Sequence, residues 1–176
     1  TGSLTLAMLA FSRASAGIDM NEVGAFLVFP GVEAGLGGGV ETFLTLTNTS
    51  AQSVLAHVAF VNGDAASSRY CYECDFDLPL SGLDTETIVL YQANGITHIG
   101  NLDSGASRSC AQRVGFVTVD VEDASHHTLT DNILLGEEVI VDYTNGAAMS
   151  LEAVSIQGGI GNGDRTFSFD GIEYRK

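Results

Sequence analysis

Hydrophobic and polar residues alternate along much of the chain with a period of two. In 115–123, Val117, Val119 and Val121 fall on one face and polar residues fall between them, as a strand with one buried face requires. Similar segments rich in β-branched and aromatic residues occupy 25–30, 40–48, 54–62, 75–80, 86–92, 137–143, 149–156 and 165–174. The pattern therefore predicts about nine β-strands.

The segments between these strands are rich in Gly, Asn, Asp and Ser, for example 31–39, 48–53 and 62–68. Asn145-Gly146 lies between two strand patterns and predicts a hairpin turn, because both residues tolerate positive φ. Short strands joined by such turns predict an all-β fold, an antiparallel two-sheet β-sandwich of the immunoglobulin-like or jelly-roll kind. We expect residues 21–176 to form this single domain.

The N-terminal segment, residues 1–20, has a different character. An apolar run ends at Phe11, and the small residues Ala14-Ser15-Ala16 follow it, as they do at the cleavage site of an export signal. The run has about 8 residues and is too short to span a bilayer, which needs roughly 20. The alternative is a strand or helix that packs in its own domain or is donated to a neighbouring subunit. The candidate assembly residues are Leu4, Leu6, Met8, Leu9 and Phe11.

The stretch ETFLTLTNTSAQSVLAHVAFVNGD, residues 41–64, resembles the first hairpin of immunoglobulin-like modules in secreted bacterial proteins. The resemblance covers this segment alone and implies a fold rather than a function. Two features of antibody domains are missing, because the chain has no Trp and its cysteines are wrongly spaced.

The composition limits the partners. The 176 residues are enough to bury a substantial core, and seven Lys and Arg stand against 22 Asp and Glu, for a formal charge of −15. Such a chain repels phosphate backbones and anionic lipid surfaces, so we expect no nucleic-acid partner. Because the apolar run is too short, we also expect no membrane span. The same charge favours divalent cations where carboxylates converge.

Two of the three cysteines form the motif Cys71-x-x-Cys74. A c-type haem anchor would need His after the second cysteine, but Asp75 stands there. A redox motif should open a helix, whereas the residues after Cys74 continue a strand pattern and are flanked by acids that raise a thiol pKa. A zinc site would need all three cysteines together with one of the four histidines, His57, His98, His126 or His127.

A disulfide typical of exported proteins explains the cysteines better. We expect Cys110 to pair with Cys74 or with Cys71, which would close a loop of about 36–39 residues and contribute about 3–4 kcal/mol. The third cysteine is then left free, buried, or paired between chains.

We expect no cofactor, with Ca²⁺ as the alternative. The segment GGIGNGD, 158–164, resembles the glycine–aspartate turn of calcium-binding β-roll repeats, but it occurs once and those repeats act in tandem. A second acidic group surrounds His126-His127. The candidate Ca²⁺ ligands are Asp120, Glu122, Asp123, Asp131 and Asp164.

No catalytic arrangement stands out. The chain has no G-x-S-x-G motif, and 22 acids alone do not mark a glycosidase pair. A carbohydrate platform would depend on Tyr70, Tyr72 and Tyr91. The sequon Asn48-Thr49-Ser50 is more simply interpreted as a turn.

These observations favour a non-enzymatic, extracellular or cell-surface protein that works by self-association or by binding a neighbouring surface protein, as a subunit of a surface layer, filament or similar assembly. The alternative is a secreted module that binds carbohydrate or another ligand. A hydrolase with unidentified carboxylates is the third hypothesis.

Overall fold

The computed structural model describes residues 18–19, 22–63, 72–123 and 125–158. These residues form twelve β-strands and one short 3-10 turn. The elements are β1 (Ile18–Asp19), β2 (Phe26–Glu33), η1 (Leu36–Gly38), β3 (Val40–Asn48), β4 (Val54–Asn62), β5 (Glu73–Leu80), β6 (Thr85–Ala93), β7 (Ile96–Asn101), β8 (Ser107–Cys110), β9 (Val114–Glu122), β10 (Leu134–Asp142), β11 (Ala147–Glu152) and β12 (Val154–Ile156).

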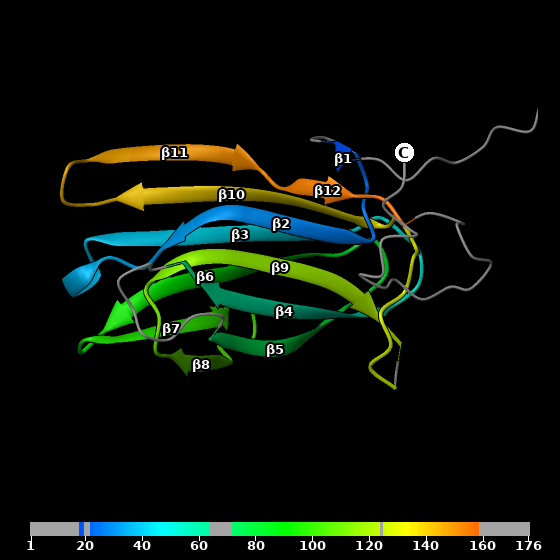
Figure 1. Cartoon of the computed structure of the whole chain (residues 1–176), viewed down its shortest axis with the longest axis horizontal. Coiled ribbons are helices and arrows are strands. Elements are labelled where there is room, and N and C mark those ends of the chain that lie inside the picture. Colours follow the sequence, from blue (N-terminus) through cyan, green and yellow to red (C-terminus); the bar gives the residue numbers. More distant parts are fainter. Residues whose placement is uncertain (1–17, 20–21, 64–71, 124, 159–176) are drawn as a thin grey trace, which may run out of the picture.

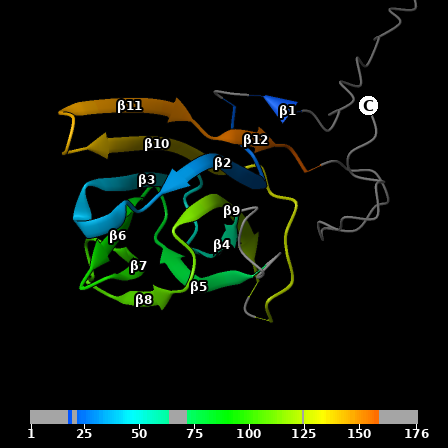
Figure 2. The same cartoon turned by 60° about the vertical axis from the view of Figure 1, so that its left-hand side comes forward.

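The strands form two antiparallel sheets of six strands each, stacked face to face (Figures 1 and 2). Sheet A has the order β1-β12-β2-β9-β4-β5, and sheet B has the order β11-β10-β3-β6-β7-β8. The expected two-sheet β-sandwich is therefore confirmed. In Figure 1, β10 and β11 lie along one side of the molecule, while β5 and β8 lie along the other.

The core lies between the sheets and follows the predicted alternation. Val117, Val119 and Val121 of β9 are fully buried, and Leu44 and Ile88 of sheet B are buried in the same cluster. Removing one such side chain from water contributes about 1.5–3 kcal/mol. The inward positions thus hold the two sheets together, while the positions between them are free to carry polar chemistry on the outer faces.

The segment 41–64 departs from the expected hairpin. Its two strands, β3 and β4, lie in opposite sheets, and β3 pairs with β6 and β10 while β4 pairs with β5 and β9. The turn between them is held by Asn48, whose buried side-chain amide donates to the carbonyls of Gln52 (2.7 Å) and Ser81 (2.9 Å). The connection is thus an arch between sheets, so the hairpin expected over 41–64 is wrong.

Two hairpin turns of sheet B use Asn-Gly. Asn145-Gly146 ends the predicted turn between β10 and β11, where Gly146 has φ 65° and Asp142 accepts hydrogen bonds from the backbone of Thr144 and Asn145. A second turn, Asn94-Gly95, joins β6 to β7 with both residues at positive φ (53° and 78°). This tight turn was not predicted, although it has the sequence of the I′ type.

Several strand bounds also differ from those expected. The predicted strand 149–156 is two strands, because the chain leaves sheet B after β11 and enters sheet A as β12. Strands β7 and β8 were not predicted. The predicted strand 165–174 and the candidate assembly residues of the N-terminal segment lie outside the described residues.

Candidate functional site

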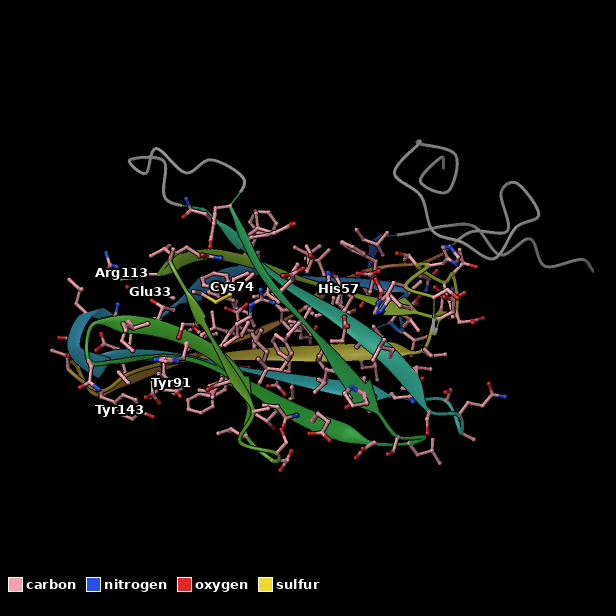
Figure 3. The ribbon with its side chains drawn as sticks, turned by 90° about the horizontal axis from the view of Figure 1, so that it is seen from below. Glu33, His57, Cys74, Tyr91, Arg113 and Tyr143 are labelled. Carbon is pink, nitrogen blue, oxygen red and sulfur yellow. A yellow bond between two sulfur atoms is a disulfide. The ribbon has the colours of Figure 1, made fainter. Side chains whose placement is uncertain are left out.

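The outer face of sheet A carries a cluster of histidine and carboxylate side chains on three adjacent strands. His57 of β4 stands opposite Asp77 of β5 on one side and Asp120 of β9 on the other. Glu122 follows two residues later on β9 and therefore points to the same face. Figure 3 shows where His57 lies within the sandwich. We call His57, Asp77, Glu122 and His126 the outer-face cluster.

His57 is held between two carboxylates. Its Nδ1 lies 3.0 Å from Oδ1 of Asp77, and its Nε2 lies 3.9 Å from Oδ2 of Asp75. Burial lowers the pKa of His57, but the hydrogen bond to Asp77 and the surrounding carboxylates outweigh that effect, and the pKa is raised. The ring therefore lies in a strongly negative environment.

His126 reaches the cluster from the loop after β9. It adopts a left-handed backbone conformation with φ 60°. Its Nδ1 lies 2.8 Å from Oε2 of Glu122 and 3.8 Å from Oδ2 of Asp77. The hydrogen bond to Glu122, with the charge of Asp77, raises the pKa of His126. The loop thus places a second imidazole over the row of strand residues.

Two carboxylates of β9 are largely buried although they lie on an outer face. Asp120 is 8% exposed and Glu122 is 9% exposed. Asp120 accepts a hydrogen bond from Oγ1 of Thr128 at 2.7 Å, and burial raises its pKa. Buried carboxylates need a compensating positive group or hydrogen-bond donors.

The candidate calcium ligands lie at different places and make different contacts. Asp120 and Glu122 border His57, whereas Asp123 accepts hydrogen bonds from the backbone of Ser125 (2.7 Å) and His127 (3.1 Å) and so organises its own loop. Asp131 lines an open groove together with Glu122 and Asp123. Asp164 lies outside the described residues.

Among the described residues, His57, Asp77 and Glu122 form a group whose candidate ligand atoms all lie within 4.8 Å of one another. From the sequence, His57 was a candidate zinc ligand and Glu122 a candidate calcium ligand, whereas Asp77 was not proposed as a ligand. Its alternation with Asp75 along β5 is visible in the sequence, but its position opposite His57 depends on which strands pair. That pairing sets β4 between β5, the next strand along the chain, and β9, which lies far from it in the sequence.

The cysteines form a disulfide, as expected. Cys74 of β5 is bonded to Cys110 of β8, with their Cα atoms 5.7 Å apart (Figure 3). This is the first of the two predicted pairings, and it removes both residues from any zinc site. Cys71 lies outside the described residues.

The aromatic candidates for a carbohydrate platform are separated. Tyr91 stacks on His98 on the outer face of sheet B, with ring centroids 5.2 Å apart. Tyr72 precedes β5 in sheet A and is 45% exposed, and Tyr70 lies outside the described residues. Tyr91 also lines an open hollow of about 270 Å³ together with Phe43 and Leu102.

The fold buries the asparagine of the sequon Asn48-Thr49-Ser50. Asn48 is fully buried, and its side-chain oxygen accepts hydrogen bonds from the backbone and the hydroxyl of Ser50 (3.0 and 2.8 Å). All of this amide's polar groups are engaged in the turn, which confirms the interpretation of Asn48-Thr49-Ser50 as a turn.

No protein-family model and no curated protein matches the chain. Among solved structures, the chain is similar to a Thermotoga maritima protein ("Crystal Structure of Thermotoga maritima 1070") at 12% identity and a TM-score of 0.47, over 77% of this chain and 97% of that one. A likeness at this level says nothing about function. The described part of the chain contains no helix of the length and apolar character needed to cross a membrane.

Proposed function

We propose that the chain is an exported, non-enzymatic subunit of a surface layer, filament or similar assembly, and that it associates through the free edge of β11. The observation that carries this proposal is the exposure of that strand. Five of its six residues are exposed, and among the described residues β11 pairs with β10 alone. Such an edge can accept a strand from another chain.

The backbone of β11 determines which residues face the edge. Ala153 donates its N–H to the carbonyl of Gly136, so its backbone N–H and C=O are directed toward β10. Because the direction of the backbone groups alternates along an antiparallel strand, the N–H and C=O groups of Met149 and Leu151 are also directed toward β10. Ala148 and Ser150 therefore direct their N–H and C=O groups away from β10, toward the free edge.

The compartment and the incoming strand complete the proposal. The disulfide between Cys74 and Cys110 supports an oxidising environment outside the cytosol. The apolar N-terminal segment, residues 4–11, is the segment that a second copy of the chain would add to β11. Backbone hydrogen bonds would supply the affinity, and Met149, which is 52% exposed, would supply apolar contact.

Light scattering after size-exclusion chromatography tests this proposal on the full chain, on a chain without residues 1–16, and on Ala148→Pro. Proline removes the outward N–H of position 148 without removing a donor from the β10–β11 ladder. Ala148→Val keeps that N–H and is the matched control. We expect the full chain and Ala148→Val to form oligomers and the other two to be monomers. A monomeric full chain, or an unchanged mass for Ala148→Pro, would contradict the proposal.

A ligand-binding module is the second candidate, and the hollow on sheet B is the observation that favours it. Gly100 and its cross-strand neighbour Val89 line this hollow, and Phe43 follows on the next strand. Tyr91 and Leu102 line it as well. Glycan-array binding that is lost in Tyr91→Ala and retained in Tyr72→Ala would support this candidate.

A further inference from the structure

The outer-face cluster has the composition of a metal site. We propose that His57, Asp77, Glu122 and His126 bind one divalent transition-metal ion of the zinc type. This goes beyond the association proposed above and does not depend on it, because the cluster lies on the outer face of sheet A and β11 belongs to the edge of sheet B.

Three of the four ligands are positioned by strands. Asp77, His57 and Glu122 stand on β5, β4 and β9, which are neighbours in the sheet and paired along eight residues on each side of β4. Ala56 and Val58, on either side of His57, are fully buried in the core. The core therefore fixes the direction in which His57 points, and a site built on such strands needs little rearrangement to bind an ion.

The distances between ligand atoms are close to those of a metal centre. Ligands of a tetrahedral zinc ion at about 2.0–2.1 Å from the metal lie about 3.3 Å from one another. In the cluster, Nδ1 of His57 lies 3.0 Å from Oδ1 of Asp77. Nδ1 of His126 lies 2.8 Å from Oε2 of Glu122 and 3.8 Å from Oδ2 of Asp77. The candidate ligand atoms of His57, Asp77 and Glu122 all lie within 4.8 Å of one another. His126 lies beside this group of three and would be the fourth ligand.

The burial of the carboxylates is a second and independent argument. Glu122 is 9% exposed and points into the cluster, where its hydrogen-bond partner is His126, a side chain that is 60% exposed. Asp120, 8% exposed, lies directly beside His57. Two carboxylates withdrawn from water beside a third, Asp77, favour a positive charge at the cluster. A divalent cation supplies that charge in one place.

The chemistry of the ligands selects the class of metal. Ca²⁺ takes six to eight oxygen ligands, whereas two imidazoles with two carboxylates suit Zn²⁺ and related first-row ions. Asp75 faces Nε2 of His57 from the other side, as an outer carboxylate does in many histidine–metal sites. Arg108 of β8 in turn bonds the side chain of Asp75 at 3.3 Å and also its backbone carbonyl.

Isothermal titration of the oxidised full chain with Zn²⁺ tests the proposal, and Co²⁺ absorption reports the coordination geometry. We expect one Zn²⁺ per chain, with an affinity reduced about 100-fold or more in His57→Ala and in Glu122→Gln. His126→Asn is the safest variant for folding because His126 is exposed, and it should lose at least about tenfold. Circular dichroism would verify that each variant is folded.

Two controls separate this site from other zinc ligands. His98→Asn removes an imidazole from the opposite sheet, and Cys71→Ser removes the thiol that is not in the disulfide. Both variants should bind Zn²⁺ like the parent chain. The proposal is overturned if the parent binds no Zn²⁺, if His57→Ala and His126→Asn bind it undiminished, or if Ca²⁺ displaces Zn²⁺. If the parent binds no Zn²⁺, the protonated side chains of His57 and His126 alone balance the charge of the carboxylates.

Discussion

Cys74 and Cys110 join the last strand of sheet A to the last strand of sheet B on the same side of the sandwich. Both side chains are buried at the edge of the core. Arg108, two residues before Cys110, adds a second link between β8 and β5 through Asp75. The disulfide therefore closes one side of the sandwich, opposite the side that β11 occupies (Figure 1).

Replacing both bonded cysteines with alanine should lower the free energy of unfolding by about 3–4 kcal/mol, because the bond closes a loop of 36 residues in the unfolded chain. Urea unfolding followed by circular dichroism measures this change. Wild-type protein unfolded with a reductant should show a loss of similar size. Equal stability of the oxidised and reduced proteins would contradict the prediction.

Asn48→Ala should destabilise the sandwich by about 2–3 kcal/mol, because the carbonyls of Gln52 and Ser81 and the N–H of Ser50 lose a buried partner. Thermal unfolding of the variant provides the measurement. Gln52→Ala is the control, since Gln52 contributes only its backbone to these contacts and is exposed. A loss no larger than that of the control would show that Asn48 does not hold the arch between the sheets.

The sequence pattern predicts the strands better than their pairing. Alternation identifies β9, because Val117, Val119 and Val121 all face the core. The same pattern cannot show that the chain changes sheets at Ala153, since Leu151 and Val154 satisfy the apolar preference of either sheet. Strand β7 was missed although Asn94-Gly95 signals the tight turn before it.

The outer-face cluster was predictable only in part for the same reason. His57 and Glu122 are visible as polar residues within apolar strands. That Asp77 stands beside them depends on the pairing of β4 with both β5 and β9. Such non-local pairing is a property of the topology, and no short segment of the chain contains it.

Gly115→Ala should cost about 3 kcal/mol or more, because a Cβ at position 115 would overlap the carbonyl of Val61, which is backbone and cannot turn aside. Gly31→Ala is the matched control in the same sheet, since a Cβ there meets nothing within 4 Å. Its stability should change by less than about 0.5 kcal/mol. Urea unfolding of the two variants in parallel distinguishes them. Equal losses would contradict the close approach of β4 and β9.

Glu138 gives the last prediction, because it is a carboxyl group inside the core. Its side chain is fully buried in β10, opposite Leu44 of β3. Within the described residues, neither of its carboxylate oxygens has a hydrogen-bond partner. Burial raises the pKa of Glu138, and the nearby backbone of Gly31, at the bulge of β2, offsets only part of the increase.

The sign of the pH dependence follows from that pKa. The unfolded chain ionises Glu138 near its ordinary value of 4.5, while the folded chain retains the proton to higher pH. Folding therefore binds a proton between the two values, so stability is lost as the pH rises from 4.5 through the folded pKa. Glu138→Met removes this loss and should raise the free energy of unfolding at pH 8 by about 1–3 kcal/mol.

Urea unfolding of Glu138→Met and the parent chain from pH 4 to pH 8 measures the effect. The advantage of the variant should shrink toward pH 4, where the carboxyl is neutral in both states. Glu137→Gln is the matched control, because Glu137 is the exposed neighbour on β10 and bonds Ser150 at 2.7 Å. It should show no comparable gain at pH 8. The prediction is contradicted if Glu138→Met is less stable than the parent at pH 8, or if its free energy of unfolding differs from the parent's by the same amount at every pH. Either result would mean that the buried carboxyl is compensated in the folded protein.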